Sequence, residues 1–388
     1  MSARAKSNET VSARAKSNET VSARAKSNET VSIPLFTPAA VDPAELDAHT
    51  VGRAALLPRL TERITDATRD GSRPHTLLLG PHGSGKTHTL HVVVHRALSD
   101  RHTAKNTLPL MLPEDSLAIG SYGDLLVELI RPHHPDARNL RSDVIGLERF
   151  ILDVAHGRMV LAAIENLDRV FESIGEAGQG SLRAWVETST AVTLFATAPA
   201  LFPAVAARTH PWYGSFIVEE LAPLTADEGA AILAGDDEEL AAYVASSEGQ
   251  DRIAAIERLI GGSPRLWHMI SETANITALQ ALQPVVAALL DRLAPSYQRR
   301  LWQLPTGEQR LVVELARGDE ARTVSDLAAA VGVSNQTASA ALGRLAAARW
   351  VSAAKADAGD RRATWYDLDD PLLRHVVQYR DNRRIPTP

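Results

Sequence analysis

The chain has 388 residues, of which 45% are apolar and 23% are charged, a composition typical of a globular protein with two or three domains. The absence of cysteine excludes disulfide bonds and metal sites built from thiolates. The N-terminus is too polar for a signal peptide, and no apolar run approaches the ~20 residues that span a bilayer. We therefore expect a cytoplasmic protein with no membrane partner.

The net charge of −6 is spread unevenly along the chain. Residues 1–32 carry six Lys or Arg and three Glu, and residues 321–388 carry ten Lys or Arg and seven Asp, so each end has a charge of +3. The middle of the chain therefore carries −12. Basic ends on an acidic body indicate an anionic partner at the ends, although an ordinary solvated surface would give the same distribution.

The N-terminal segment is a tandem repeat. The ten residues "SARAKSNETV" occur three times in succession from Ser2 to Val31. Because the only apolar side chains in the unit are Ala and Val, the segment cannot build a core. We predict that residues 1–32 form a disordered tail.

Short apolar runs alternate with helical patterns over residues 33–222. Such alternation predicts a doubly wound parallel sheet with helices on both faces, the α/β class. The runs that we expect to be its strands are 75–80, 106–113, 159–165, 191–198 and 216–221.

Beyond this unit the pattern changes. Ala- and Leu-rich helical segments fill residues 223–304, which we expect to form a helical lid, and a compact unit follows over residues 305–388.

A phosphate-binding motif follows the first expected strand. Residues 80–87 read "GPHGSGKT" and match G-x-x-x-x-G-K-[ST], with a strand before them and a helix after them, as the motif requires. The glycines allow the backbone amides to wrap around a phosphate chain. Lys86 should reach the β- and γ-phosphates, and the Thr87 hydroxyl should ligate Mg²⁺.

The partner carboxylate is expected at the end of a second buried strand. Glu165 ends the run 159–165, so it takes the position from which a carboxylate can hold Mg²⁺ or a metal-bound water. Asn166 follows it where a catalytic Glu is usual, and an amide can orient water but cannot accept its proton. Asp168 is either a substitute for that Glu or the N-cap of the next helix. Hydrolysis is therefore expected to be slow.

Two further residues lie where they could sense the phosphates. Thr197 ends the run 191–198, and Arg265 follows a Gly-Gly-Ser-Pro turn at the start of a lid helix. A cation at such a position can report the state of the phosphates to the lid.

With these motifs, the chain resembles the AAA+ ATPases, and within them the origin-recognition-complex and archaeal initiator branch, over most of residues 45–388. "HTVGR" (49–53) is similar to the segment that lines the adenine pocket in that branch, Thr197 matches sensor 1, and Arg265 in "GGSPR" matches sensor 2. The resemblance implies ATP and Mg²⁺ as cofactors. The residues expected to contact the nucleotide are Val51, Gly52, Arg53, Gly80, Pro81, His82, Gly83, Ser84, Gly85, Lys86, Thr87 and His88.

The same resemblance implies an arginine finger and an oligomer. "AARTHPWYGSF" (206–216) lies where the branch carries its finger, which makes Arg208 the candidate, with Arg183 as its rival. A finger supplied by a neighbouring subunit stabilises the charge of the transition state, so full activity would need a homo-oligomer.

The C-terminal unit reads as a winged helix. In residues 323–351, Leu327, Ala328 and Val331 are spaced to pack inside, Gly332 makes a turn, and Ser334 can cap a second helix. The polar groups that would meet DNA bases or phosphates on that helix are Asn335, Gln336, Ser339 and Arg344.

A hairpin signal follows and supplies the wing. Lys355, Arg361 and Arg362 are placed at its tip, where the DNA backbone would pass. The family resemblance supports binding of duplex DNA, whereas many winged helices mediate only protein contacts.

The leading hypothesis is an ATP-dependent, DNA-binding switch or assembly factor, in a defence or mobile-element context. The alternative is a signalling NTPase of the STAND type, whose winged helix is an internal latch and whose effector is a separate protein. A chain that ends soon after the winged helix favours the first.

Overall fold

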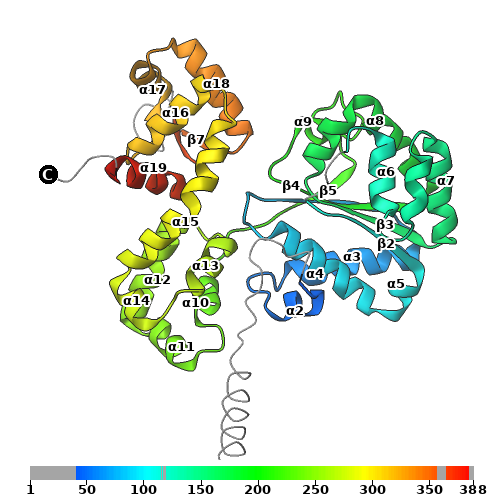
Figure 1. Cartoon of the computed structure of the whole chain (residues 1–388), viewed down its shortest axis with the longest axis horizontal. Helices are drawn as coiled ribbons and strands as arrows, with labels where there is room; N and C mark the ends of the chain where they lie inside the picture. The colour runs from blue at the N-terminus through cyan, green and yellow to red at the C-terminus, as the bar shows by residue number, and fades with distance from the viewer. Residues whose placement is uncertain (1–40, 115, 117–118, 356–363, 384–388) are drawn as a thin grey trace, which may run out of the picture.

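The computed structural model describes residues 41–114, 116, 119–355 and 364–383. The expected disordered tail, residues 1–32, lies outside these ranges. The described chain forms three lobes (Figure 1): an α/β lobe, a lobe of short helices, and a C-terminal lobe that the long helix α15 joins to the second.

The α/β lobe is built on a five-stranded parallel sheet. The strand order is β2-β3-β4-β1-β5, so β1 lies between β4 and β5 although β2 follows it in sequence. All five runs expected to be strands are strands, and the predicted α/β class with a doubly wound parallel sheet is confirmed. Their bounds are β1 His75–Leu79, β2 Thr107–Leu112, β3 Met159–Ile164, β4 Val192–Ala198 and β5 Phe216–Glu220.

Helices cover both faces of this sheet, as Figure 1 shows. One face packs on α2 (Pro43–Ala48), α3 (Leu56–Asp70), α4 (Lys86–Ser99) and α5 (Arg101–Asn106). The other packs on α6 (Tyr122–Ile130), the 3₁₀ helix η2 (Pro135–Leu140), α7 (Val144–Ala155), α8 (Leu167–Ser189) and α9 (Pro203–Ala206). Strands buried on both faces explain why the sequence runs are continuously apolar rather than alternating.

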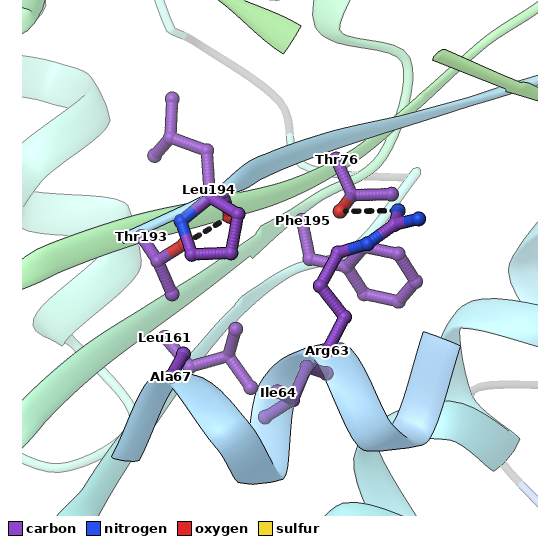
Figure 2. Close-up of a pocket in the computed structure, with 9 residues that line it drawn as sticks. Arg63, Ile64, Ala67, Thr76, Leu161, Thr193, Leu194 and Phe195 are labelled. Carbon is purple, nitrogen blue, oxygen red and sulfur yellow. Dashed lines mark hydrogen bonds between the residues drawn. The ribbon is translucent and has the colours of Figure 1, made fainter. Parts of the chain in front are cut away.

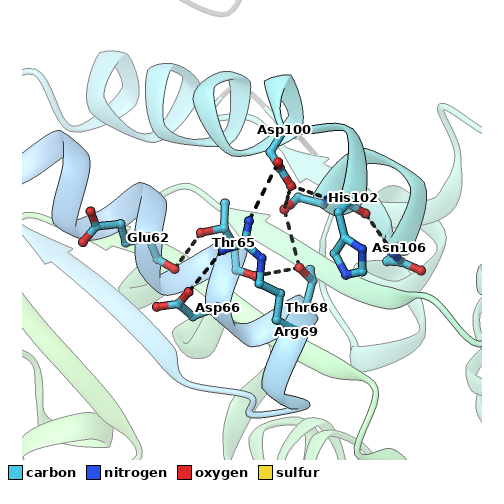
Figure 3. Close-up of polar contacts among 9 residues, drawn as sticks. Glu62, Thr65, Asp66, Thr68, Arg69, Asp100, His102 and Asn106 are labelled. Atoms are coloured by element: carbon cyan, nitrogen blue, oxygen red, sulfur yellow. Dashed lines mark hydrogen bonds and ion pairs between the residues drawn. The ribbon is translucent and has the colours of Figure 1, made fainter.

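Polar contacts join the helices of the first face at their ends (Figure 3). Asp100 caps α5 by accepting a hydrogen bond of 2.9 Å from the Thr103 amide, and Arg69 of α3 lies 3.8 Å from its carboxylate. These groups are exposed, so the ion pair contributes little, and their main effect is to stop α4 and start α5 within one residue.

A small pocket lies between α3 and the sheet (Figure 2). Arg63 closes it by donating a hydrogen bond of 3.1 Å to Thr76 at the start of β1. Ligands of open parallel sheets bind beyond the carboxyl ends of the strands, and this pocket is at the other end. It is therefore an imperfection of packing rather than a candidate site.

The second lobe contains the helices that follow β5. The segment after β5 is joined to the turn before α13 by a hydrogen bond of 2.8 Å from the Leu224 amide to the Gly262 carbonyl. The helices are α10 (Ala226–Ala234), α11 (Glu238–Ala245), α12 (Ser247–Ile260), α13 (Pro264–Ser271), α14 (Ile276–Ala281) and α15 (Gln283–Trp302).

The C-terminal lobe is a winged helix. Its elements are α16 (Thr306–Arg317), β6 (Arg322–Thr323), α17 (Val324–Val331), α18 (Asn335–Ala347), β7 (Val351–Lys355), β8 (Thr364–Leu368) and α19 (Pro371–Arg383). Strand β8 pairs with both β6 and β7 in an antiparallel sheet. Gly332 ends α17 with a φ of 72°, and the Ser334 hydroxyl caps α18, as the sequence predicts.

The winged helix and the helical lobe share one apolar core. Buried side chains from Leu224 to Val377 form a continuous cluster that includes members of α10, α15, α16 and α19. The two lobes therefore form one packed body.

None of the helices within the described ranges is long and apolar enough to cross a membrane.

Candidate nucleotide-binding site and winged-helix surface

The phosphate-binding loop connects β1 to α4. Gly83 and Gly85 have φ values of 84° and 89°, a region that side chains with a Cβ rarely adopt. A Cβ on Gly80 would lie 2.5 Å from Ser84 Oγ. No described side chain caps the start of α4, which leaves its first amides able to bind an anion.

Lys86 lies in the centre of the loop and is 8% exposed. Its ammonium donates hydrogen bonds to the carbonyls of Gly80 (2.7 Å) and Pro81 (3.1 Å). Burial lowers the pKa of Lys86 to about 8, while the carboxylates of Glu114, Asp168 and Glu165 oppose that shift. A phosphate chain would replace the carbonyls as a better partner for the charge.

The Thr87 hydroxyl donates a hydrogen bond to the Glu165 carboxylate, which links the start of α4 to the end of β3. Glu165 is buried, and its other oxygen lies 3.9 Å from His91 Nε2. His91 follows Thr87 by one turn of α4, so the two side chains share a face of that helix. The sequence shows this spacing, but whether the face meets a carboxylate depends on the fold.

Asn166 and Thr197 meet at the ends of β3 and β4. Thr197 is 1% exposed, and its hydroxyl accepts a hydrogen bond of 3.1 Å from the backbone N–H of Asn166. Asn166 has a φ of 49°, a left-handed conformation that asparagine tolerates better than most residues. Thr197 therefore fixes the backbone that carries Asn166.

Asp168 is not the N-cap of α8. That position belongs to Asn166, because the helix begins at Leu167, one residue after the left-handed turn. Asp168 lies in the first turn of α8, and burial raises the pKa of its carboxyl. Its Oδ1 is buried without a hydrogen-bond partner among the described residues, so it is free to take one.

The Gly-Gly-Ser-Pro-Arg turn packs directly on the phosphate-binding loop. The Arg265 amide donates a hydrogen bond of 3.3 Å to the Gly83 carbonyl, and the Ser263 hydroxyl lies 3.5 Å from the same oxygen. A Cβ on Gly83 would lie 3.2 Å from the Arg265 Cβ. Arg265 is thus placed at the loop by the lid.

The segment 49–53 lies against both the loop and the lid. Arg53 donates a hydrogen bond of 3.1 Å to the Ser84 carbonyl, and the Thr50 hydroxyl lies 2.7 Å from His88 Nε2. Burial lowers the pKa of His88 to about 4. A Cβ on Gly52 would lie 2.4 Å from Leu224 at the start of the lid, and Val51 packs on the lid core.

The two arginine-finger candidates lie on the same face of the sheet. Arg208 follows α9, is exposed, and forms no ion pair with any residue that the structure describes. Arg183 is on α8 and is bound to Glu187, one turn further along, at 2.6 Å. Arg208 therefore has its charge exposed to solvent, whereas Arg183 is paired with Glu187 across one turn of α8.

Three charged residues near the loop are not marked by any local pattern. Glu114 follows β2 and acts on the charges of Lys86 and Arg265. Arg300 and Arg349 reach the same region from α15 and from the turn after α18. Sequence reasoning missed them because only the packing of the three lobes brings them there.

The surface of the winged helix carries the polar groups expected on it. Asn335, Gln336 and Ser339 are exposed along α18. Arg344 is exposed as well, with 64% of its side chain open to solvent, and it donates a hydrogen bond of 2.7 Å to the buried Glu308 carboxylate of α16. The side chain of Lys355 and the whole of Arg361 and Arg362 lie outside the described parts of the structure.

The ligands present suit magnesium. Within the described residues, no three acidic or histidine side chains form a group that could hold a metal ion alone. The contact between the Thr87 hydroxyl and the Glu165 carboxylate offers two oxygen ligands beside the loop. Mg²⁺ prefers such a site, since it is commonly held by one or two protein oxygens together with nucleotide phosphates.

Comparison with known proteins gives one family model and several solved structures. A model of the MarR family matches residues 302–363, and a search of curated proteins finds no match. The structure of the ORC2 protein of Aeropyrum pernix, in ADPNP and ADP complexes, aligns with a TM-score of 0.61 at 14% identity. The alignment covers 88% of this chain and 98% of the ORC2 chain. The ORC1 protein of the same organism, in complex with DNA, aligns with a TM-score of 0.48 at 15% identity, over 87% of this chain and 95% of that chain.

At these identities the likeness is one of fold. The parallel sheet and the C-terminal winged helix agree with what the sequence predicts. The chain therefore shares the fold of the ORC2 protein of Aeropyrum pernix, and a segment of its C-terminal lobe matches the MarR family model.

Proposed function

We propose that the protein is an ATP-binding, DNA-binding AAA+ ATPase that acts as a nucleotide-dependent switch or assembly factor on DNA. The observation that carries the proposal is the convergence of Lys86, the Thr87–Glu165 contact and Arg265 on one loop. Three separate parts of the sequence supply these groups, and all of them suit a polyphosphate. The similar ORC2 protein was solved with ADPNP and ADP, which supports an adenine nucleotide.

Mg²⁺ held by Thr87 and Glu165 would neutralise charge on the phosphates. The residues of this chain position the rest: the loop amides and Lys86 bind the phosphates, and Thr197 fixes the backbone of Asn166. Asn166 can orient a water molecule, and the partly buried Asp168 carboxyl, whose Oδ1 has no hydrogen-bond partner among the described residues, can accept the proton. Turnover is accordingly slow.

DNA binding rests on the winged helix. Asn335, Gln336 and Ser339 face solvent at the start of α18, the position from which a recognition helix reads base edges. The exposed Arg208 supports a homo-oligomer in which one subunit completes the site of the next.

The STAND-type alternative has one observation in its favour. Arg349 of the winged helix lies 3.8 Å from Glu220 at the end of β5, so the winged helix touches the α/β lobe as a latch would. Both functions need the nucleotide site, and they differ in whether α18 meets DNA. A separate effector protein is a partner only in this second case.

ATP turnover tests the core of the proposal. Wild-type protein should hydrolyse ATP slowly, and faster with duplex DNA, while Lys86→Ala should abolish turnover because the phosphates lose their main cation. Lys105→Ala, an exposed lysine on α5, is the matched control and should leave the rate unchanged. The rate of ATP turnover is measured as phosphate release under excess Mg²⁺. Tight binding without turnover in either condition would make the protein a binding switch, and no binding would refute the proposal.

Substitution of Asn166 tests what limits hydrolysis. Asn166→Glu restores a carboxylate, and turnover should rise about tenfold or more if general-base catalysis limits the rate. Asn166→Gln is the control, because it keeps an amide and pays the same cost of the left-handed backbone. Equal rates for Glu and Gln, together with loss of turnover in Asp168→Asn, would assign the proton to Asp168.

The arginine finger is tested by Arg208→Ala beside Arg183→Ala. If Arg208 completes a neighbouring site, its loss should leave ATP affinity within about twofold and lower turnover by ~10³-fold. Arg183→Ala should change neither quantity, because that arginine is held by Glu187. Nucleotide titration and phosphate release separate the two effects, and weakened binding in Arg208→Ala would contradict the assignment.

DNA readout is tested on α18. Asn335→Ala with Gln336→Ala should weaken binding to a preferred duplex by about 1–3 kcal/mol without changing its salt dependence, because both side chains are neutral. Gln303→Ala, exposed at the end of α15, is the control. Fluorescence anisotropy at several salt concentrations measures it. If the wild-type protein binds duplex DNA but the double variant binds it equally well, α18 is not the reading element.

A further inference from the structure

A junction of three segments forms at the phosphate-binding loop. The turn of residues 261–265 packs on Gly83 from the lid side, and a Cβ on Gly261 of this turn would lie 3.4 Å from Pro371 of the winged helix. Beside Pro371, Asp370 accepts a hydrogen bond of 2.5 Å from the Tyr297 hydroxyl of α15. The winged helix is thereby held next to the nucleotide site through the lid.

Arg349 extends from the winged helix toward the α/β lobe at this junction. It occupies the turn between α18 and β7 with a φ of 55°, and its guanidinium lies 3.8 Å from the Glu220 carboxylate. Glu220 ends β5 and is in register with Leu79, the residue directly before the loop. The arginine is therefore placed at the edge of the sheet where the phosphate-binding loop begins.

The ion pair that holds Arg349 is a weak one. The Glu220 side chain is 71% exposed and the Arg349 side chain is 36% exposed, so water screens the attraction. Such a pair is readily exchanged for a more highly charged anion at similar distance. The left-handed backbone of Arg349 costs free energy, and it persists only because the surrounding turn holds it in place.

Positive charges from four elements gather around the loop. They are Lys86 on α4, Arg265 on α13, Arg300 on α15 and Arg349. Arg300 stacks on the Trp350 ring at 4.9 Å, next to Arg349 in sequence. A group of cations at one edge of the sheet raises the local positive potential and so favours a bound anion.

We propose that Arg349 binds the terminal phosphate of the nucleoside triphosphate, so that the winged helix contributes a ligand to the nucleotide site of its own chain. Binding exchanges the Glu220 carboxylate for the phosphate. The proposal rests on the proposed nucleotide function and adds to it a physical route by which the phosphates determine where the winged helix sits.

The discrimination between ATP and ADP tests the proposal. Full-length protein is titrated with fluorescent ATP and ADP analogues in Mg²⁺, as wild type and as Arg349→Gln. Arg349→Gln should weaken ATP about tenfold and change ADP by less than about twofold, because one charged hydrogen bond to the terminal phosphate is lost. Gln pays the same left-handed cost as Arg, so the comparison isolates the guanidinium.

Two further variants separate this effect from a structural one. Arg317→Gln removes an ion pair of the winged helix with Asp381, at 3.0 Å, and should leave the ATP-to-ADP affinity ratio unchanged. Glu220→Gln releases Arg349 and should raise ATP affinity. An unchanged ratio in Arg349→Gln, or an equal loss for both nucleotides, would overturn the assignment while leaving the nucleotide site intact. Failure of wild-type protein to bind either nucleotide would overturn the proposed function and this inference together.

Discussion

The contact between the Gly83 carbonyl and the Arg265 amide joins the lid to the phosphate-binding loop, and the arrangement of the site depends on it. The contact requires a close approach of the loop and the lid, because a Cβ added to Gly83 would lie only 3.2 Å from the Arg265 Cβ. Gly262 allows the turn to reach Leu224 at the start of the lid, where a Cβ would lie 2.4 Å from a carbonyl oxygen. Three regions that are distant in sequence are thereby held around one loop. Their charged side chains are brought to the loop with them.

The ends of the parallel strands supply the other half of the site. Because β1, β3 and β4 lie side by side and run in the same direction, Gly80, Glu165 and Thr197 reach one edge of the sheet. The two carboxyl groups there have different surroundings. Glu165 is buried, is bound to Thr87 and lies near His91. Asp168 is partly buried and has a raised pKa, and its Oδ1 has no hydrogen-bond partner among the described residues. This difference suits one group for holding a cation and the other for accepting a proton.

The sequence predicts well what local patterns encode. The five strands, the turn at Gly332 and the cap at Ser334 each depend on a few neighbouring residues, and the structure contains them. The same holds for the phosphate-binding loop, whose glycines and lysine lie within eight residues. Of the two roles that the sequence leaves open for Asp168, the N-cap is wrong, because the left-handed turn at Asn166 starts the helix two residues earlier.

Contacts between elements that are distant in sequence could not be predicted in this way. The environments of Arg300 and Arg349 depend on how a helix and a turn from distant parts of the chain pack against the loop. Arg344 illustrates the same limit, since its charge belongs to a pair with Glu308 that no spacing along α18 reveals. Residue type and period describe a single element, whereas these pairs depend on the angle between elements.

The apolar core that the lid shares with the winged helix has a mechanical consequence. A packed core transmits displacement without deforming, so the two lobes behave as a rigid lever whose pivot is the short link between β5 and α10. The turn of residues 261–265 is close to that pivot, and α18 is at the far end of the lever (Figure 1). A small rotation about the pivot therefore becomes a larger displacement of α18, in proportion to its distance from the pivot.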